Sequence, residues 1–161
     1  MIRKIVSGGQ TGADRAALDW ALDAGIECGG WCPAERLAED GSIALKYPLS
    51  ETPSGGYAQR TEWNVRDSDA TVIVSLARKL TGGSALTEKI ASRWNRPCLL
   101  ISKEGREASA STLMHFVDEN RIETLNVAGP RESTEAGVGV FVRSVLKGAF
   151  SRTADQVESE D

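Results

Sequence analysis

The chain contains few of the residues that commonly carry catalysis or cross-links: one histidine and three cysteines among its 161 residues. A Ser-His-Asp mechanism would have to use His115, which stands between Met114 and Phe116 in a predicted helix and is interpreted as structural. Three cysteines form no even disulfide framework. Cys28 and Cys32 are a weak zinc signal, because no second cysteine pair and no nearby histidine accompany them. We therefore expect no catalytic residue and no metal held by protein side chains.

Long apolar runs and an excess of positive charge are also missing. No apolar run approaches membrane length and no signal peptide opens the chain, so we expect a cytoplasmic protein with reduced thiols and no membrane partner. The net charge is −4, but residues 151–161 alone sum to −3. The nearly neutral remainder argues against a nucleic-acid partner. We expect one ligand-binding domain over residues 1–150, followed by an acidic, disordered tail over residues 151–161.

Short apolar runs alternate with amphipathic helical patterns along the rest of the chain. This alternation predicts an α/β fold in which a doubly wound, mainly parallel sheet of about five strands carries helices on both faces. The expected strands span residues 2–6, 26–31, 70–76, 98–101 and 122–128. The expected helices follow Gly12 as far as Gly25 and then span residues 57–67, 85–94, 108–120 and 133–146.

A glycine-rich turn over residues 8–12 joins the first predicted strand to the first predicted helix. Its glycines permit positive φ and close approach of a ligand, and the following helix start offers free amides and a positive dipole end to an anion. The sequence is neither a P-loop, because no Lys-Ser/Thr pair follows, nor the dinucleotide pattern G-x-G-x-x-G, because Gly8 precedes Gly9 directly. Thr11 and Asp14 have the spacing of a capping box, so Asp14 is either a cap or a ligand contact.

A second glycine turn, Gly82-Gly83, also precedes a predicted helix. If residues 70–76 and the strand after them lie beside the first strand, both turns face one crevice beyond the carboxyl ends of the strands. Such a crevice suits a phosphorylated small molecule. The arginines that would supply counter-charge are Arg15, Arg36, Arg60 and Arg131. The predicted ligand-binding residues are Gly8, Gly9, Gln10, Thr11, Gly12, Asp14, Arg15, Arg60, Gly82, Gly83, Ser84 and Thr87.

Residues 32–56 between the second strand and the next helix show no clear period and contain several prolines and glycines. Such a stretch is typical of a functional lid or of a binding or assembly loop, and a plain surface excursion is the alternative.

Longer motifs resemble those of the molybdenum cofactor carrier proteins over most of residues 4–148. They are residues 8–15, Gly29-Gly30-Trp31-Cys32-Pro33, Ala38-Glu39-Asp40-Gly41, Tyr47-Pro48-Leu49, Glu51-Thr52, Arg60-Thr61-Glu62 and residues 64–70. The resemblance implies a Rossmann-like fold and a homo-oligomer, a dimer or a tetramer. It also implies a carrier that binds molybdenum cofactor (molybdopterin), a pterin with a terminal phosphate and a dithiolene that holds the molybdenum. The alternative is a protein that binds phosphate or a nucleotide, for example a nucleotide-binding sensor.

The related phosphoribohydrolases, which cleave nucleoside monophosphates, carry Pro-Gly-Gly-x-Gly-Thr-x-x-Glu at the second turn. Here Thr81, Ala85, Leu86 and Lys89 replace the proline, the third glycine, the threonine and the glutamate of that motif. Glu88 stands one residue early, which on a helix is about 100° away. The departures favour a binding protein over an enzyme.

Overall fold

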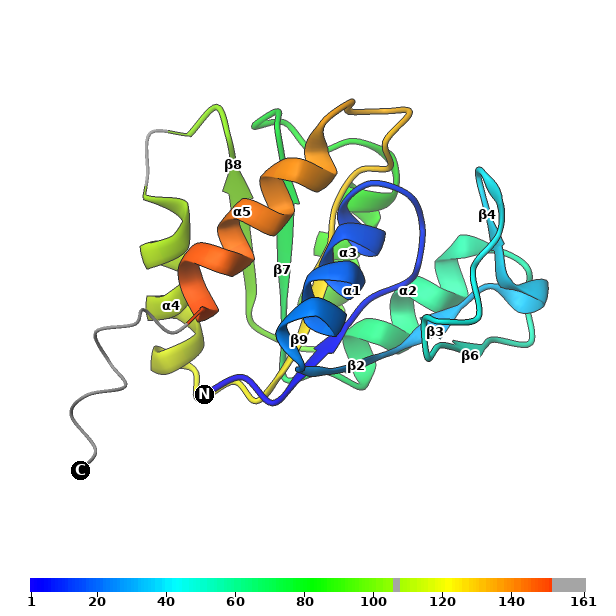
Figure 1. Ribbon diagram of the computed structural model, residues 1–161, viewed down its shortest axis with the longest axis horizontal. Helices are drawn as coiled ribbons and strands as arrows, with labels where there is room; N and C mark the ends of the chain where they lie inside the picture. The colour runs from blue at the N-terminus through cyan, green and yellow to red at the C-terminus, as the bar shows by residue number, and fades with distance from the viewer. Residues whose placement is uncertain (106–107, 152–161) are drawn as a thin grey trace.

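A five-stranded parallel sheet forms the centre of the molecule (Figure 1). The structure is a computed structural model that describes residues 1–105 and 108–151, so the predicted tail beyond residue 151 lies outside the described residues. The strands of this sheet are β1 (Lys4–Val6), β2 (Glu27–Gly29), β7 (Ala70–Ser75), β8 (Cys98–Ser102) and β9 (Thr124–Ala128). All their pairings are parallel.

The strands lie in the order β2-β1-β9-β7-β8, so β9, the last along the chain, occupies the middle of the sheet. The condition that β7 lies beside β1 is not met: β1 pairs with β2 and β9, and β7 pairs with β9 and β8. If β9 is counted first, the order becomes 3-2-1-4-5, which is the order of a Rossmann sheet. The fold is Rossmann-like, and the strand that comes first in the usual Rossmann order comes last among the strands of this sheet.

Helices cover both faces of the sheet, as the alternating pattern predicted. They are α1 (Ala13–Ala24), α2 (Tyr57–Arg66), α3 (Gly82–Arg93), α4 (Ser109–Glu119) and α5 (Val138–Phe150). On one face α5 packs against both α1 and α4, and on the other α2 packs against α3 (Figure 1). Because both faces are covered, all six residues of β7 are buried, in keeping with its uninterrupted run of apolar and small side chains.

Three predicted helix boundaries differ by three or more residues from those in the structure: the start of α3 and both ends of α5, which extends to Phe150 where residue 146 was expected. α3 begins at Gly82, three residues earlier than expected, so Gly82 and Gly83 form the first turn of the helix instead of a turn before it. α5 begins at Val138, because Gly137 at its start adopts a left-handed conformation with φ 89°. No helix in the described part of the chain is both long enough and apolar enough to span a membrane.

The stretch over residues 32–56 holds short strands in place of regular core elements. These are β3 (Trp31–Cys32), the 3-10 turn Ala34–Arg36, β4 (Leu37–Ala38), β5 (Gly41–Ser42) and β6 (Ser50–Glu51). Arg36 organises the stretch: its guanidinium donates to the carbonyl oxygens of Ile43 (3.0 Å), Ala44 (2.8 Å), Tyr47 (2.9 Å) and Leu49 (3.2 Å). Arg36 is therefore engaged inside the loop and supplies no counter-charge to a ligand.

Three side-chain contacts tie this loop to α1, one of them an ion pair of 3.9 Å between Lys46 and Asp19. Arg15 forms an ion pair with Asp40 in the turn between β4 and β5. The hydroxyl of Tyr47 donates to Asp19 over 2.6 Å. Burial and the Asp19 carboxylate together raise the pKa of Tyr47 to about 12. The contacts hold the β4–β5 hairpin over the turn that follows β1.

Candidate functional site

A cavity of about 570 Å³ opens beyond the carboxyl ends of β1 and β9. Four segments line it: the turn after β1, the first turns of α2, the start of α3, and the loop that follows β9. On one side of β9 lie β1 and β2, and on the other β7 and β8, so the cavity sits at the switch point where Rossmann-like folds bind ligands. Its volume is within the range of small-molecule sites, about 300–1,000 Å³.

The start of α3 forms an open part of the cavity wall. Gly82 and Gly83 are exposed, and a Cβ atom at either position would meet no other atom within 4 Å. The first amides of a helix have no intrahelical partner, and the helix dipole is positive at this end. The hydroxyl of Thr87, one turn further on, donates to the carbonyl of Gly83 over 2.8 Å. This wall therefore offers backbone donors to an anion without an intervening side chain.

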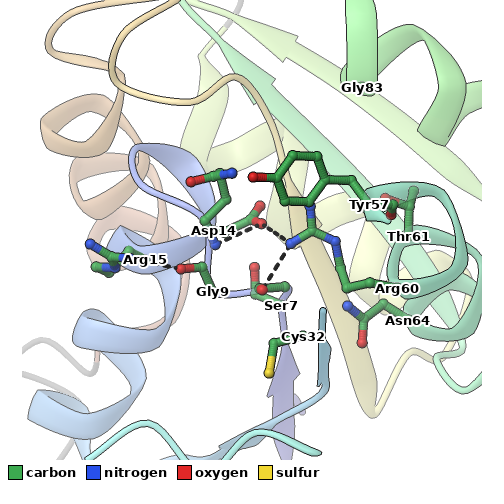
Figure 2. Close-up of polar contacts among 12 residues, drawn as sticks. Ser7, Gly9, Asp14, Arg15, Cys32, Tyr57, Arg60, Thr61, Asn64 and Gly83 are labelled. Atoms are coloured by element: carbon green, nitrogen blue, oxygen red, sulfur yellow. Dashed lines mark hydrogen bonds and ion pairs between the residues drawn. The ribbon is translucent and has the colours of Figure 1, made fainter. Parts of the chain in front are cut away.

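Arg60 of α2 crosses from the second helix layer to the turn after β1. Its Nη1 donates to the carbonyl of Gly8 over 2.8 Å and lies 3.4 Å from Oδ2 of Asp14 (Figure 2). Arg60 and Asp14 are each 8% exposed, so this ion pair is buried. The guanidinium also explains why position 8 is a glycine, because a Cβ atom there would lie 2.2 Å from Arg60 Nη1.

Asp14 is the carboxylate that faces the cavity. Burial raises its pKa above the ordinary value of 3.8, and Arg60 and the amide of Gln10 act in the opposite direction. The amide of Gln10 reaches Asp14 Oδ2 over 3.4 Å, whereas the predicted capping box is absent, since Gly12 is the residue before α1 and no side chain caps the helix. A neutral or paired Asp14 repels a nearby phosphate less than a free carboxylate would.

Tyr57 lies between two arginines at the edge of the cavity. The Cζ atoms of Arg60 and Arg131 are 5.3 Å and 5.2 Å from the centre of its ring, within the range of cation–π attraction. Arg131 belongs to the loop after β9, so the three side chains join two separate walls. Figure 2 shows Tyr57 and Arg60 on the same side of the turn that carries Asp14.

Two polar donors at the cavity have no hydrogen-bond partner among the described residues: Nε2 of Gln10 and Nε of Arg60. The side-chain oxygen of Gln10 is fixed, because it accepts from the amides of Thr11 (3.1 Å) and Glu39 (2.9 Å). The amide nitrogen is thereby left as a donor. Buried donors without a partner are rare in folded proteins, and a bound ligand is one way to satisfy them.

Eight of the twelve predicted ligand-binding residues line this cavity, and four lie beside it. Those in the lining are Gly8, Gln10, Asp14, Arg60, Gly82, Gly83, Ser84 and Thr87. The four beside it serve the surrounding structure. Arg15 turns to Asp40 and to the carbonyl of Gly9, on the far side of the α1 turn from Arg60 (Figure 2). The hydroxyl of Thr11 donates to Glu39.

The two glycines among these four are required by packing. Gly9 and Gly12 both have positive φ, 80° and 78°. A Cβ at Gly9 would lie 2.7 Å from Leu49, and one at Gly12 would lie 2.6 Å from the carbonyl oxygen of Pro130. A side chain at either position would therefore strike neighbouring protein and would not enter the cavity.

The structure adds lining residues that the sequence did not single out as ligand contacts. They include Tyr57, Thr61, Asn64, Ser133 and Thr134. Of these, Asn64 has a structural role as well: its side chain accepts from the amide of Trp31 and donates to its carbonyl. A signal existed for Asn64, which stands four residues after Arg60 and so shares its helix face. The hydroxyl residues carry no comparable signal, because such residues are common on any surface.

The described residues offer few side chains for metal binding or for acid–base catalysis. Within residues 1–105 and 108–151, no three His, Cys, Asp or Glu side chains are placed to hold a metal ion. His115 is on the surface of α4, 3.6 Å from Glu119. Glu88 and Lys89 are exposed and do not line the cavity.

The chain was compared with known proteins. A family model described as the circularly permutated YpsA SLOG family matches residues 5–150. The crystal structure of a protein named "putative molybdenum carrier protein", from Syntrophus aciditrophicus SB, is similar to this chain with a TM-score of 0.89 and 44% sequence identity, over 93% of this chain and 96% of that chain. No curated protein matches. These findings confirm the predicted resemblance and the Rossmann-like fold, and the central position of β9 agrees with a permuted chain order. The chain therefore belongs to the circularly permutated YpsA SLOG family.

Proposed function

We propose that the chain is a carrier that binds a phosphorylated small molecule in this cavity, with the phosphate at the start of α3. The observation that carries the proposal is the exposed first turn of α3, where Gly82 and Gly83 leave the backbone amides uncovered. The buried Arg60, whose Nε lacks a partner, supplies an independent donor to the same cavity. Helix starts of this kind bind phosphate through amides and the dipole together.

We propose further that the ligand is molybdenum cofactor. Support comes from the similar protein named as a molybdenum carrier and from the size and polarity of the cavity. The amide of Gln10, the two guanidiniums beside Tyr57, and the hydroxyls of Ser84 and Thr61 would face the polar edge of a pterin and its phosphate. The dithiolene of the cofactor holds the molybdenum, so the proposal requires no metal ligand from the protein.

The test replaces Gly83 by valine, which directs a side chain into the open space at the helix start. Gly55 provides a matched control, because it too has open space at its Cβ position and no positive φ, and it does not line the cavity. One charge-assisted hydrogen bond contributes about 1.5–3 kcal/mol. Gly83→Val should therefore weaken binding of inorganic phosphate roughly 10- to 150-fold by isothermal titration, and Gly55→Val should leave it unchanged.

Stability is not expected to confound the comparison, since valine has a slightly higher helix propensity than glycine. Unchanged phosphate affinity in Gly83→Val would place the anion elsewhere. The identity of the ligand is decided separately, by pterin fluorescence and by molybdenum mass spectrometry of the purified protein. A nucleotide absorbance spectrum in place of pterin fluorescence would make the protein a nucleotide binder.

A further inference from the structure

Glu39 lies outside the cavity but contacts three residues that line it. It follows β4 in the β4–β5 hairpin. Its backbone amide donates to the side-chain oxygen of Gln10 over 2.9 Å. Its carboxylate accepts from the hydroxyl and the amide of Ser133, the latter over 3.3 Å, and lies 3.8 Å from Nη1 of Arg131. One residue thus reaches the turn after β1 and the loop after β9.

The hydrogen bonds to Glu39 favour its ionised form, which accepts hydrogen bonds through both oxygens. The hydroxyls of Ser133 and Thr11, which both donate to it, lower its pKa below the ordinary value of 4.5. The hydroxyl of Thr11 in turn accepts from the amide of Glu132 over 3.2 Å. The group of Glu39, Thr11, Glu132 and Ser133 therefore fastens the hairpin to both neighbouring segments.

Other contacts anchor the loop after β9 on either side of this group. The carbonyl of Pro130 accepts from the amide of Ala13 over 3.1 Å, and the carboxylate of Glu135 accepts from the amides of Leu76 and Ala77 over 2.6 Å and 3.2 Å. Between these anchors, the Glu39 group holds residues 131–133 against the hairpin. Arg131 and Ser133 have no other side-chain acceptor in the described structure. Without Glu39, the side chain of Ser133 would be free to take other rotamers, and that of Arg131 would keep only its contact with the Tyr57 ring.

We propose that Glu39 is a positioning residue of the cavity, which holds Arg131 and Ser133 in the arrangement that binds the anion. The inference rests on the proposed phosphate site. A ligand that binds to side chains already held in place loses less conformational entropy than one that must order them. Two side chains of this kind account for a difference of about tenfold in affinity.

The opposite effect has a physical basis too, because Glu39 is negative and partly neutralises Arg131. If the carboxylate acted mainly as a competitor of the ligand anion, its removal would strengthen anion binding. Glu39→Gln separates the two effects, since glutamine keeps an oxygen that accepts from Thr11 and Ser133 but has no charge. Glu39→Ala removes both the charge and the acceptor.

Asp40 provides the matched control in the same hairpin. Its carboxylate pairs with Arg15, and neither residue lines the cavity. Asp40→Ala therefore loosens the hairpin without releasing Arg131 or Ser133. A general effect of hairpin destabilisation would appear in this variant as well.

The experiment combines two measurements on the full chain. Isothermal titration with inorganic phosphate should show about tenfold weaker binding in Glu39→Ala, binding within about threefold of wild type in Glu39→Gln, and no change in Asp40→Ala. Hydrogen exchange should show faster exchange of residues 129–137 in Glu39→Ala but not in Asp40→Ala. Rescue by glutamine distinguishes positioning from a role of the charge.

Two results would overturn the proposal. One is unchanged exchange of residues 129–137 in Glu39→Ala, which would show that the carboxylate does not hold the loop. The other is tighter phosphate binding in Glu39→Gln and Glu39→Ala, which would make Glu39 a competitor. Failure of the proposed function looks different: the wild type itself would not bind phosphate, while the exchange measurement would still report whether Glu39 orders the loop.

Discussion

Replacement of Arg60 by methionine tests the buried ion pair between α2 and the turn after β1. Methionine retains much of the apolar volume of the side chain but leaves Asp14 buried without its cation and the carbonyl of Gly8 without its donor. The side chains of Arg60 and Asp14 are 10% and 11% exposed, so solvent replaces the lost partner only in part. Removing one member of a buried pair costs about 3–5 kcal/mol, a large share of the stability of an ordinary domain.

The loss should depend on pH in a defined direction. The pKa of Asp14 in the folded protein already lies above 3.8, and the loss of Arg60 removes the strongest influence that lowers it. A carboxyl with a raised folded pKa stabilises the fold most below its unfolded pKa, and this contribution is lost as the pH rises through the folded pKa. Arg60→Met should therefore be closest to wild type near pH 4.5 and furthest from it near pH 8.

The assay is urea unfolding at both pH values. Arg143→Met is the surface control, since Arg143 pairs with Asp23 where both side chains are 44% or more exposed, and exposed pairs contribute at most about 1 kcal/mol. The double variant Asp14→Asn/Arg60→Met should regain stability at pH 8 and lose the pH dependence. Two results would refute the reasoning. One is a free energy of unfolding for Arg60→Met within about 1 kcal/mol of the wild-type value at pH 8. The other is an equal loss of unfolding free energy at both pH values.

Four further substitutions test other parts of the structure. Arg36→Lys keeps the charge, but a lysine cannot donate to all four carbonyls, so the free energy of unfolding should fall by about 2–4 kcal/mol. Limited proteolysis should cut residues 44–56 faster than in the wild type, and equal protease resistance would contradict the role of Arg36. Tyr47→Phe should cost about 1 kcal/mol, and ultraviolet titration should lose the tyrosine that ionises near pH 12 in the wild type. Gly30→Ala should destabilise by more than about 2 kcal/mol, because φ is 128° and a Cβ would lie 2.5 Å from a backbone oxygen. Gly41→Ala, with φ 114° and open space, should cost about 1 kcal/mol; equal losses at the two glycines would rule out the clash as the cause.

The sequence was sufficient to predict which segments form the fold but not how the strands are ordered. The apolar runs around β7, β8 and β9 predict buried strands wherever they lie in a sheet. Neighbour relations depend on tertiary pairing, and no local pattern distinguishes β9 at the edge from β9 between β1 and β7. The start of α3 was placed late because glycine is a poor helix former, although at the first turn it leaves the amides open.

The candidate site was predictable where helix geometry decides it. Gly82 and Gly83 stand at a helix start, and Arg60 and Asn64 share a helix face, so both pairs reach the cavity. The sequence predicts Arg15 as a source of counter-charge, but a positive charge alone does not show which way the side chain points. Adjacent helical residues point about 100° apart, so Asp14 faces the cavity while Arg15 turns to the hairpin.

The position of β9 also determines when the protein can fold. The two halves of the sheet, β2-β1 and β7-β8, have no direct pairing and are joined by β9 alone. A growing chain that stops before residue 124 lacks the strand that joins the two halves and one wall of the cavity. Contacts between segments so far apart in the chain form slowly, because a long loop must close first. The protein therefore completes its ligand cavity only after β9 and the loop that follows it have been made, and a ligand can stabilise the chain from that point but not its earlier fragments.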